Sequence, residues 1–264
     1  MRFRFRSPIA ACVLSVLVGG CAADASTTPA ATPTLDAALA EVAHPALDFA
    51  TATFSGAGAV VPAIVPSTCQ LDTASQVFVC APVTGGWLTL DQSYVLLDAA
   101  GAKQSAFDPT TTKGVSVTNA VSGQNTDQGN TLTVDGQETL DLTGLGSARH
   151  TLNGTSLTLT TYVSAANLTH PPVQSTITTK ITDLVIPVVP SGQPVAWPLS
   201  GTIATKTIIE FGEPIPSGGT STTEVVTLTF NGSSVVTLSM SLPSGGVQTC
   251  RVNLALVSGG VGCP

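Results

Sequence analysis

The chain has 264 residues, of which 43% are hydrophobic and only 9% are charged, and its formal net charge is −7. The apolar fraction is sufficient for a core, but the charged fraction is far below the roughly 25% of an ordinary globular protein. An acidic chain with so few lysines and arginines cannot form the basic stripe that binds phosphates. This composition argues against nucleic-acid binding and against electrostatic attachment to lipid headgroups.

The first 20 residues have the pattern of a secretory signal peptide. Arg2, Arg4 and Arg6 form a positive segment, and the run from Pro8 to Val18 carries no charge. This run is too short to span a bilayer, which takes about 20 apolar residues. Removal of the three arginines with the signal would leave the mature chain more acidic still.

The segment Leu17-Val18-Gly19-Gly20-Cys21 closes this run and resembles a lipobox, the cleavage site of bacterial lipoproteins. The resemblance implies cleavage before Cys21 and attachment of lipid to that cysteine. Val18 stands where the family most often has Leu. Cleavage after Ala25 is the alternative, because Ala23-Asp24-Ala25 fits the A-x-A pattern of an ordinary signal peptidase.

A lipidated Cys21 would hold the protein at a membrane, because each buried methylene contributes about 0.8 kcal/mol and two or three chains anchor firmly. In the sorting pattern of enteric lipoproteins, Asp after the cysteine retains the protein at the inner membrane. Ala22 stands here instead, so the resemblance implies a cell-envelope protein anchored at the outer membrane. Residues 21–34 are rich in Pro and Thr and are predicted to form an extended tether. Residues 35–48 are predicted to include a short helix that ends before Pro45.

Four cysteines would remain in the mature chain, since Cys12 is lost with the signal and Cys21 carries lipid. An even number in an exported protein favours disulfides. The favoured pairing is local, because each pair brackets a predicted hairpin, although three connectivities are open. A zinc site is disfavoured, because the close CxxC-type spacing is missing. The four cysteines are Cys69, Cys80, Cys250 and Cys263.

From Phe49 onward, apolar and polar residues alternate with period two, which predicts β-strands. After a strand at 49–54, residues 86–98 are predicted to form two strands around a turn at Asp91 to Ser93. The other predicted strands are 77–80, 114–121, 131–142, 155–163, 173–188, 199–211, 223–231, 234–242 and 249–257.

This alternation indicates a sheet with one dry and one wet face. In their strands, Val226, Leu228 and Phe230 share a face, and so do Leu157 and Leu159. Tight turns are predicted at three dipeptides typical of hairpins, namely Asp135-Gly136, Asn153-Gly154 and Asn231-Gly232. We therefore expect residues 49–264 to form a single all-β domain. Its fold would be an antiparallel meander of about 10–13 strands, as a strongly curved sheet, half-barrel or barrel, with a β-sandwich as the alternative.

Catalytic motifs are weak. His44, His150 and His170 are accompanied by no GxSxG motif. Glycoside hydrolysis needs two carboxylates in one cleft, for which the candidate pairs are Glu138 with Asp141 and Glu210 with Glu213.

Ligand-binding motifs are equally weak. A loop with Asn125, Asp127, Asn130 and Asp135 is rich in oxygen ligands but lacks the order of an EF-hand. Trp87 and Trp197 are candidates for ligand contacts, although most tryptophans that open strands are core residues. The sequence thus indicates no cofactor and no metal.

The mature part also resembles uncharacterised Thr-rich β lipoproteins, a likeness that implies no activity. The favoured function is a non-catalytic, lipid-anchored envelope protein with a binding or structural role. The partner implied is the membrane, through the lipid, and no ligand or protein partner is identified. The alternatives are a carrier of an apolar ligand in a half-barrel and a glycan hydrolase.

Overall fold

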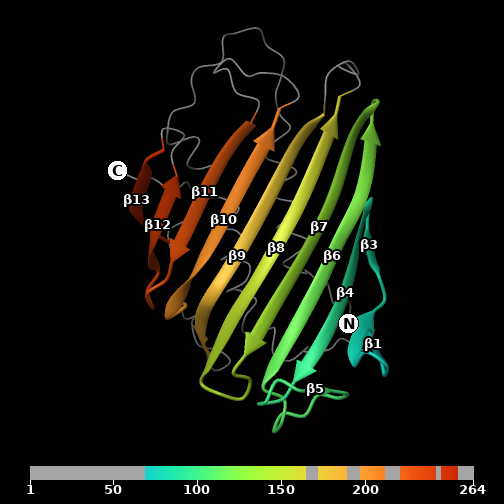
Figure 1. The fold of residues 1–264 in the computed structure, drawn as a ribbon, viewed down its shortest axis with the longest axis vertical. Helices are drawn as coiled ribbons and strands as arrows, with labels where there is room; N and C mark the ends of the chain where they lie inside the picture. The colour runs from blue at the N-terminus through green and yellow to red at the C-terminus, as the bar shows by residue number, and fades with distance from the viewer. Residues whose placement is uncertain (1–68, 165–171, 189–196, 212–220, 242–244, 255–264) are drawn as a thin grey trace, which may run out of the picture.

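The computed structural model describes residues 69–164, 172–188, 197–211, 221–241 and 245–254. These residues form no helix, and thirteen strands account for most of them (Figure 1). The strands are β1 (Cys69–Asp72), β2 (Val77–Cys80), β3 (Val83–Gly85), β4 (Leu88–Leu97), β5 (Lys103–Gln104), β6 (Gly114–Asp127), β7 (Asn130–Thr143), β8 (Arg149–Val163), β9 (Val173–Pro187), β10 (Ser200–Glu210), β11 (Ser221–Thr229), β12 (Val235–Ser241) and β13 (Val247–Asn253).

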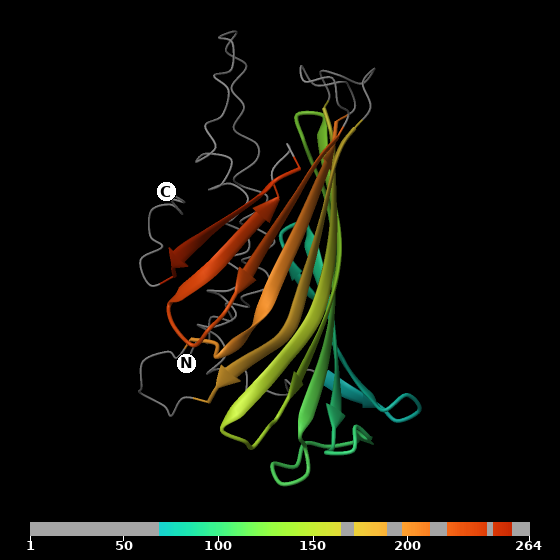
Figure 2. The same cartoon turned by 60° about the vertical axis from the view of Figure 1, so that its left-hand side comes forward.

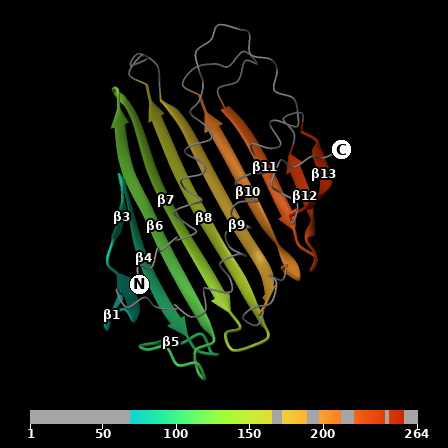
Figure 3. The same ribbon diagram turned by 180° about the vertical axis from the view of Figure 1, so that it is seen from behind.

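All thirteen strands belong to one antiparallel sheet. From β6 to β13, each strand pairs with the next one along the chain, while β1, β2 and β4 extend the sheet on the other side and β3 and β5 add to β4. β1 and β13 end the sheet at opposite edges, as the view from behind shows (Figure 3). The predicted antiparallel meander is therefore confirmed, in the form of an open sheet.

The sheet is strongly curved. The long strands β6 to β8 run nearly side by side, whereas β11 to β13 swing away from them (Figure 2). Glycines within the long strands fit this curvature, because a strand glycine often marks a bend or a close approach of neighbouring strands. A Cβ added at Gly136 would lie 2.8 Å from Cγ1 of Val121, and one at Gly154 would lie 2.6 Å from Cδ2 of Leu140.

Strand pairing divides the sheet into two faces. Ile181, Ile203, Leu228 and Leu238 are paired in one row from β9 to β12, and all four are buried. We call the side of the sheet that carries this row the core face, and the opposite side the open face. The predicted alternation of β11 is confirmed, because Val226, Leu228 and Phe230 are all buried.

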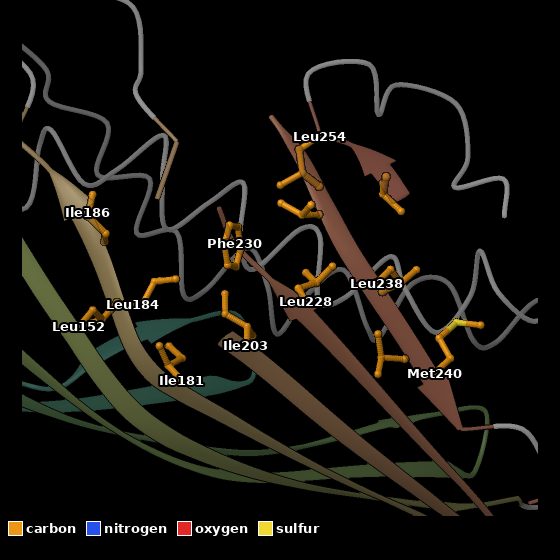
Figure 4. Packing of buried hydrophobic residues seen from close by; sticks show 13 residues of the cluster. Leu152, Ile181, Leu184, Ile186, Ile203, Leu228, Phe230, Leu238, Met240 and Leu254 are labelled. Carbon is orange, nitrogen blue, oxygen red and sulfur yellow. The ribbon is translucent and has the colours of Figure 1, made fainter. Parts of the chain in front are cut away.

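The core face carries two clusters of buried apolar side chains. The larger one draws its residues from β8 to β13 and the segments beside them (Figure 4). It includes Leu152, Ile181, Leu184, Ile186, Ile203, Val226, Leu228, Phe230, Val236, Leu238, Met240, Val252 and Leu254. The smaller cluster lies near the other edge and comprises Phe78, Leu96, Val115 and Leu145.

An extra residue in β9 changes which of its side chains face the core. Thr182 and Asp183 together stand opposite the single Asn153 of β8, where the register of the two strands shifts. Such a β-bulge shifts the alternation by one residue. Ile181 and Leu184 are therefore both buried on the core face, although three positions separate them.

Several local expectations were wrong. Residues 88–97 form the single strand β4 rather than two strands, because Asp91 to Ser93 pair continuously with β6. Asp135-Gly136 and Asn153-Gly154 lie inside β7 and β8 rather than in turns. In both cases the neighbouring strand continues past the dipeptide, and pairing with it overrides the local turn preference.

The observed turns use other dipeptides as well. Gln128 and Gly129 join β6 to β7 with φ of 50° and 82°, a conformation in which glycine meets no steric penalty. Asn231-Gly232 lies in the connection between β11 and β12, as predicted, although this connection is the longer loop 230–234 rather than a tight turn. Gly232 has φ of 84°, and Oδ1 of Asn231 accepts a hydrogen bond from the Ser233 amide at 3.2 Å.

One predicted disulfide is confirmed. Cys69 and Cys80 stand directly opposite each other on β1 and β2 and are bonded. Cys250 is also disulfide-bonded, but its partner lies outside the described residues, so its pairing with Cys263 stays a prediction. The lipobox, the tether, the helix predicted within 35–48 and the strand at 49–54 also lie outside the described residues.

Candidate functional site

The open face is a broad polar surface made mainly of Thr and Ser. One cross-strand row shows this composition over eight strands, from β6 to β13. The row consists of Thr118, Thr139, Thr155, Lys180, Ala204, Thr227, Ser239 and Thr249. β-Branched threonines suit an exposed strand position, and their hydroxyls both donate and accept hydrogen bonds.

The β9 bulge shapes a depression in this face, which we call the bulge hollow. It has a volume of about 270 Å³. Its lining comprises Thr139, Asp141, Asn153, Gly154, Thr155, Lys180, Ile181 and Thr182. The Ile181 side chain is buried on the core face, and Gly154 has none, so these two residues line the hollow with backbone.

Asn153 fixes the backbone of the bulge. Its Oδ1 accepts a hydrogen bond from the Asp183 amide at 2.8 Å. Asp183 has φ of 46°, a left-handed conformation that costs energy for a residue with a side chain. Since the Asn153 oxygen is used in this way, its amino group is the donor left for the hollow.

Two opposite charges stand on the rim of the hollow. Asp141 pairs with Asn153 along the sheet, and Lys180 pairs with Thr155, so the two charges lie in different cross-strand rows. Both side chains are exposed. The hollow therefore offers an anionic acceptor on one side and a cationic donor on the other.

Two leucines interrupt the polar surface beside the hollow. Leu157 and Leu159 follow Thr155 on the same face of β8 and are 50% and 40% exposed. They share a face, as their spacing indicated, but that face is the open one, against the expectation of a dry side. Alternation alone shows that two residues share a face and not which face is covered.

A polar network crosses the core face at β4, β6 and β7. Nε2 of Gln92 donates to Oδ1 of Asn119 at 3.0 Å, and Nδ2 of Asn119 donates to Oε2 of Glu138 at 2.8 Å. Glu138 is only 9% exposed. Burial raises the pKa of the Glu138 carboxyl, and the hydrogen bond from Asn119 offsets part of this rise. Burial therefore makes Glu138 easier to protonate than a solvent-exposed glutamate.

Of the two carboxylate pairs proposed from the sequence, the one that lies wholly within the described residues does not come together. Glu138 lies on the core face and Asp141 on the open face, because an odd number of positions separates them in a strand. Glu210 ends β10 on the open face, where it pairs with Gln174 and Ser221. Its predicted partner, Glu213, lies outside the described residues.

The two tryptophans occupy separate places. Trp197 packs against the larger core cluster, and Trp87 covers Gly123, where an added Cβ would lie 3.0 Å from the indole Cε3. Both are half-buried. Trp197 and Glu210 flank opposite ends of β10, so these two candidates do not share a site.

The described residues of the histidine and calcium motifs do not form a site. His150 lies inside β8 with its side chain buried, and burial lowers its pKa. Asp135 faces the opposite side of the sheet from Asn125, so the oxygen-rich residues do not converge. Within the described ranges, no three His, Cys, Asp or Glu side chains gather as metal ligands.

Reasoning from the sequence missed the bulge hollow. Asn153-Gly154 suggested a turn, which hid the position of Asn153 in the middle of a strand. The available signal was the spacing of the apolar residues Ile181, Leu184 and Ile186, which breaks strict alternation at Thr182 and Asp183. A break of this kind inside a predicted strand indicates a bulge.

Comparisons with models of protein families, with curated proteins and with solved structures find no match to this chain. In the described part of the chain, no helix is long and apolar enough to cross a membrane.

Proposed function

We propose that this chain is a non-catalytic lipoprotein of the bacterial cell envelope, held at the outer membrane by lipid on Cys21, whose sheet binds a partner through its open face. The lipobox at Leu17–Cys21 supports the anchor. The observation that carries the binding role is the continuous Thr- and Ser-rich surface from β6 to β13, with the bulge hollow and two exposed leucines in it. The two exposed leucines add an apolar contact area to this otherwise polar surface.

The two alternative functions receive less support. A carrier needs free apolar space on the core face, yet Ile203, Leu228 and Leu238 in the larger cluster are fully buried. A glycan hydrolase needs two carboxylates in one cleft, whereas Glu138 and Asp141 lie on opposite faces.

Metabolic labelling with a fatty acid tests the anchor. The wild-type chain and a Cys12→Ser variant should incorporate the label, because Cys12 is predicted to leave with the signal peptide. A Cys21→Ser variant should incorporate none. Equal labelling of the wild type and Cys21→Ser would refute the anchor. Mass spectrometry of the mature N-terminus distinguishes cleavage before Cys21 from cleavage after Ala25.

A further inference from the structure

We propose that the bulge hollow binds a neutral, hydroxyl-rich ligand, namely one sugar unit of a glycan. This inference rests on the proposed role of the open face as a binding surface and assigns that surface a ligand class. It is carried by four features of the hollow: its hydrogen-bonding groups, its balanced charge, its fixed backbone and the leucines beside it.

The hydrogen-bonding groups of the hollow match those of a sugar. Thr139 and Thr155 supply hydroxyls that donate and accept, Asp141 supplies an acceptor, and Lys180 and the Asn153 amino group supply donors. A sugar hydroxyl likewise donates and accepts. Such a ligand can use both kinds of group at once, whereas a ligand with donors alone would leave Lys180 and the Asn153 amino group unpaired, and one with acceptors alone would leave Asp141 unpaired.

The two opposite charges on the rim favour a ligand without net charge. An anion would be attracted by Lys180 and repelled by Asp141, and a cation would meet the reverse arrangement. In the part of the chain that the structure describes, no ion pair involves Asp141 or Lys180. Each charge therefore remains available for charge-assisted hydrogen bonds to hydroxyl groups, which are stronger than bonds between neutral groups.

The hollow is formed before a ligand arrives. The hydrogen bond from the Asp183 amide to Asn153 holds the bulge in place, and paired strand backbone lies beneath it. A fixed site avoids part of the ordering cost of binding. The hollow is a shallow depression of about 270 Å³ that is open to solvent, below the roughly 300–1,000 Å³ range of pockets for drug-sized ligands, so it would hold one ring at most.

The exposed leucines provide the apolar part of the site. Leu157 is two residues beyond Thr155 on the same face, a distance of about 7 Å along a strand. A sugar ring has an apolar C–H side, which aromatic residues cover in many glycan sites. None of the described residues that line this hollow is aromatic, so we assign that contact to Leu157.

Binding measurements on the full chain in detergent test the proposal. The probes are a soluble oligosaccharide of N-acetylglucosamine, followed by calorimetry, and insoluble peptidoglycan sacculi, followed by co-sedimentation. The first probe represents a free glycan and the second a polymer in the envelope. Thr155→Val removes a hydroxyl from the hollow, and Asp141→Asn removes the anionic acceptor. Thr223→Val on β11 is the matched control, because it alters an exposed threonine of the same face outside the hollow.

We expect the wild type and Thr223→Val to bind at least one probe with equal affinity, and each hollow variant to bind it about tenfold more weakly. Circular dichroism would confirm that every variant is folded. The proposal is overturned if the wild type binds neither probe, or if the hollow variants bind as tightly as Thr223→Val. In that event a positive fatty-acid labelling result would still support the anchor, so the two proposals fail separately.

Discussion

Asn119 and Glu138 join β6 to β7 through a hydrogen bond of 2.8 Å on the core face, where both side chains are buried. The two residues are direct cross-strand partners, and Gln92 on β4 extends the bond into a network. A buried carboxyl is tolerated in such a position when it is hydrogen-bonded and uncharged.

This network predicts that Glu138→Gln stabilises the protein increasingly as pH rises. The folded-state pKa of Glu138 is raised, whereas an unfolded Glu titrates near pH 4.3. The stability contributed by the neutral acid is therefore complete below about pH 4 and is lost as pH rises through the folded-state pKa. Gln keeps an amide oxygen for Asn119 and does not ionise. Urea unfolding at pH 4 and pH 8 should show the difference between variant and wild type growing with pH.

Gln137→Ala is the control for this prediction, because Gln137 is the neighbouring residue of β7 and faces the open side. Its effect on unfolding should be the same at both pH values. A Glu138→Gln effect that stays constant between pH 4 and pH 8 would contradict a raised pKa of the Glu138 carboxyl.

The assignment of the two faces predicts that truncating a leucine destabilises the protein strongly on the core face and only slightly on the open face. Leu228→Ala removes a side chain with 0% exposure and should lower the free energy of unfolding by about 2–5 kcal/mol. Leu157→Ala removes one from the open face and should cost less than about 0.5 kcal/mol. Denaturant titration of the pair measures both values. Comparable losses would mean that the open face is covered.

The bulge predicts that position 183 tolerates only residues that can adopt a positive φ. The positive φ of Asp183 excludes β-branched residues, so Asp183→Val should destabilise the protein by about 1–3 kcal/mol, while Asp183→Gly should be neutral or stabilising. Asn153→Ala removes the acceptor for the Asp183 amide and should cost about 1–2 kcal/mol. Thermal unfolding would rank these variants, and equal behaviour of Asp183→Val and Asp183→Gly would argue against the left-handed conformation.

An alanine substitution at Gly154 distinguishes the observed position of this residue inside a strand from the turn position that the Asn153-Gly154 dipeptide suggested. Gly154→Ala should destabilise the protein by about 1–3 kcal/mol, because the added methyl overlaps Leu140 and the Thr139 carbonyl. Gly85→Ala is the matched control, since an added Cβ there meets nothing within 4 Å. Chemical unfolding compares the two, and a tolerated Gly154→Ala would place that residue outside the paired strand.

Peptide mapping without reduction identifies the pairing of the cysteines directly. We expect one peptide that links Cys69 to Cys80 and another that links Cys250 to Cys263. The first pair closes a short loop, so replacing both cysteines by Ser should cost about 2–3 kcal/mol. A fragment that joins Cys250 to any other cysteine would disprove the second pairing.

Much of the fold could be predicted because hydrophobic alternation is a local property. The antiparallel meander, the positions of most long strands and the buried set in β11 all follow from it. The errors have a common cause, since Asp91, Gly136 and Gly154 carry turn preferences that continuous pairing with a neighbouring strand overrides. The candidate site could not be predicted, because it depends on the register of β7 with β8 and on the bulge between β8 and β9, which together place Asp141, Asn153 and Lys180 around one hollow.

The sequence by itself determined the all-β class and the one-sided pattern of β11. It favoured, without deciding, the local pairing of Cys69 with Cys80 and a lipobox at Leu17–Cys21. Only the tertiary structure decided that Leu157 faces outward, that Glu138 faces the core and that Ile181 and Leu184 share a face across a bulge. The physical reason is that alternation fixes relative orientation within one strand. Which side becomes the core, and where an extra residue shifts the register, depend on neighbouring strands that are distant in sequence.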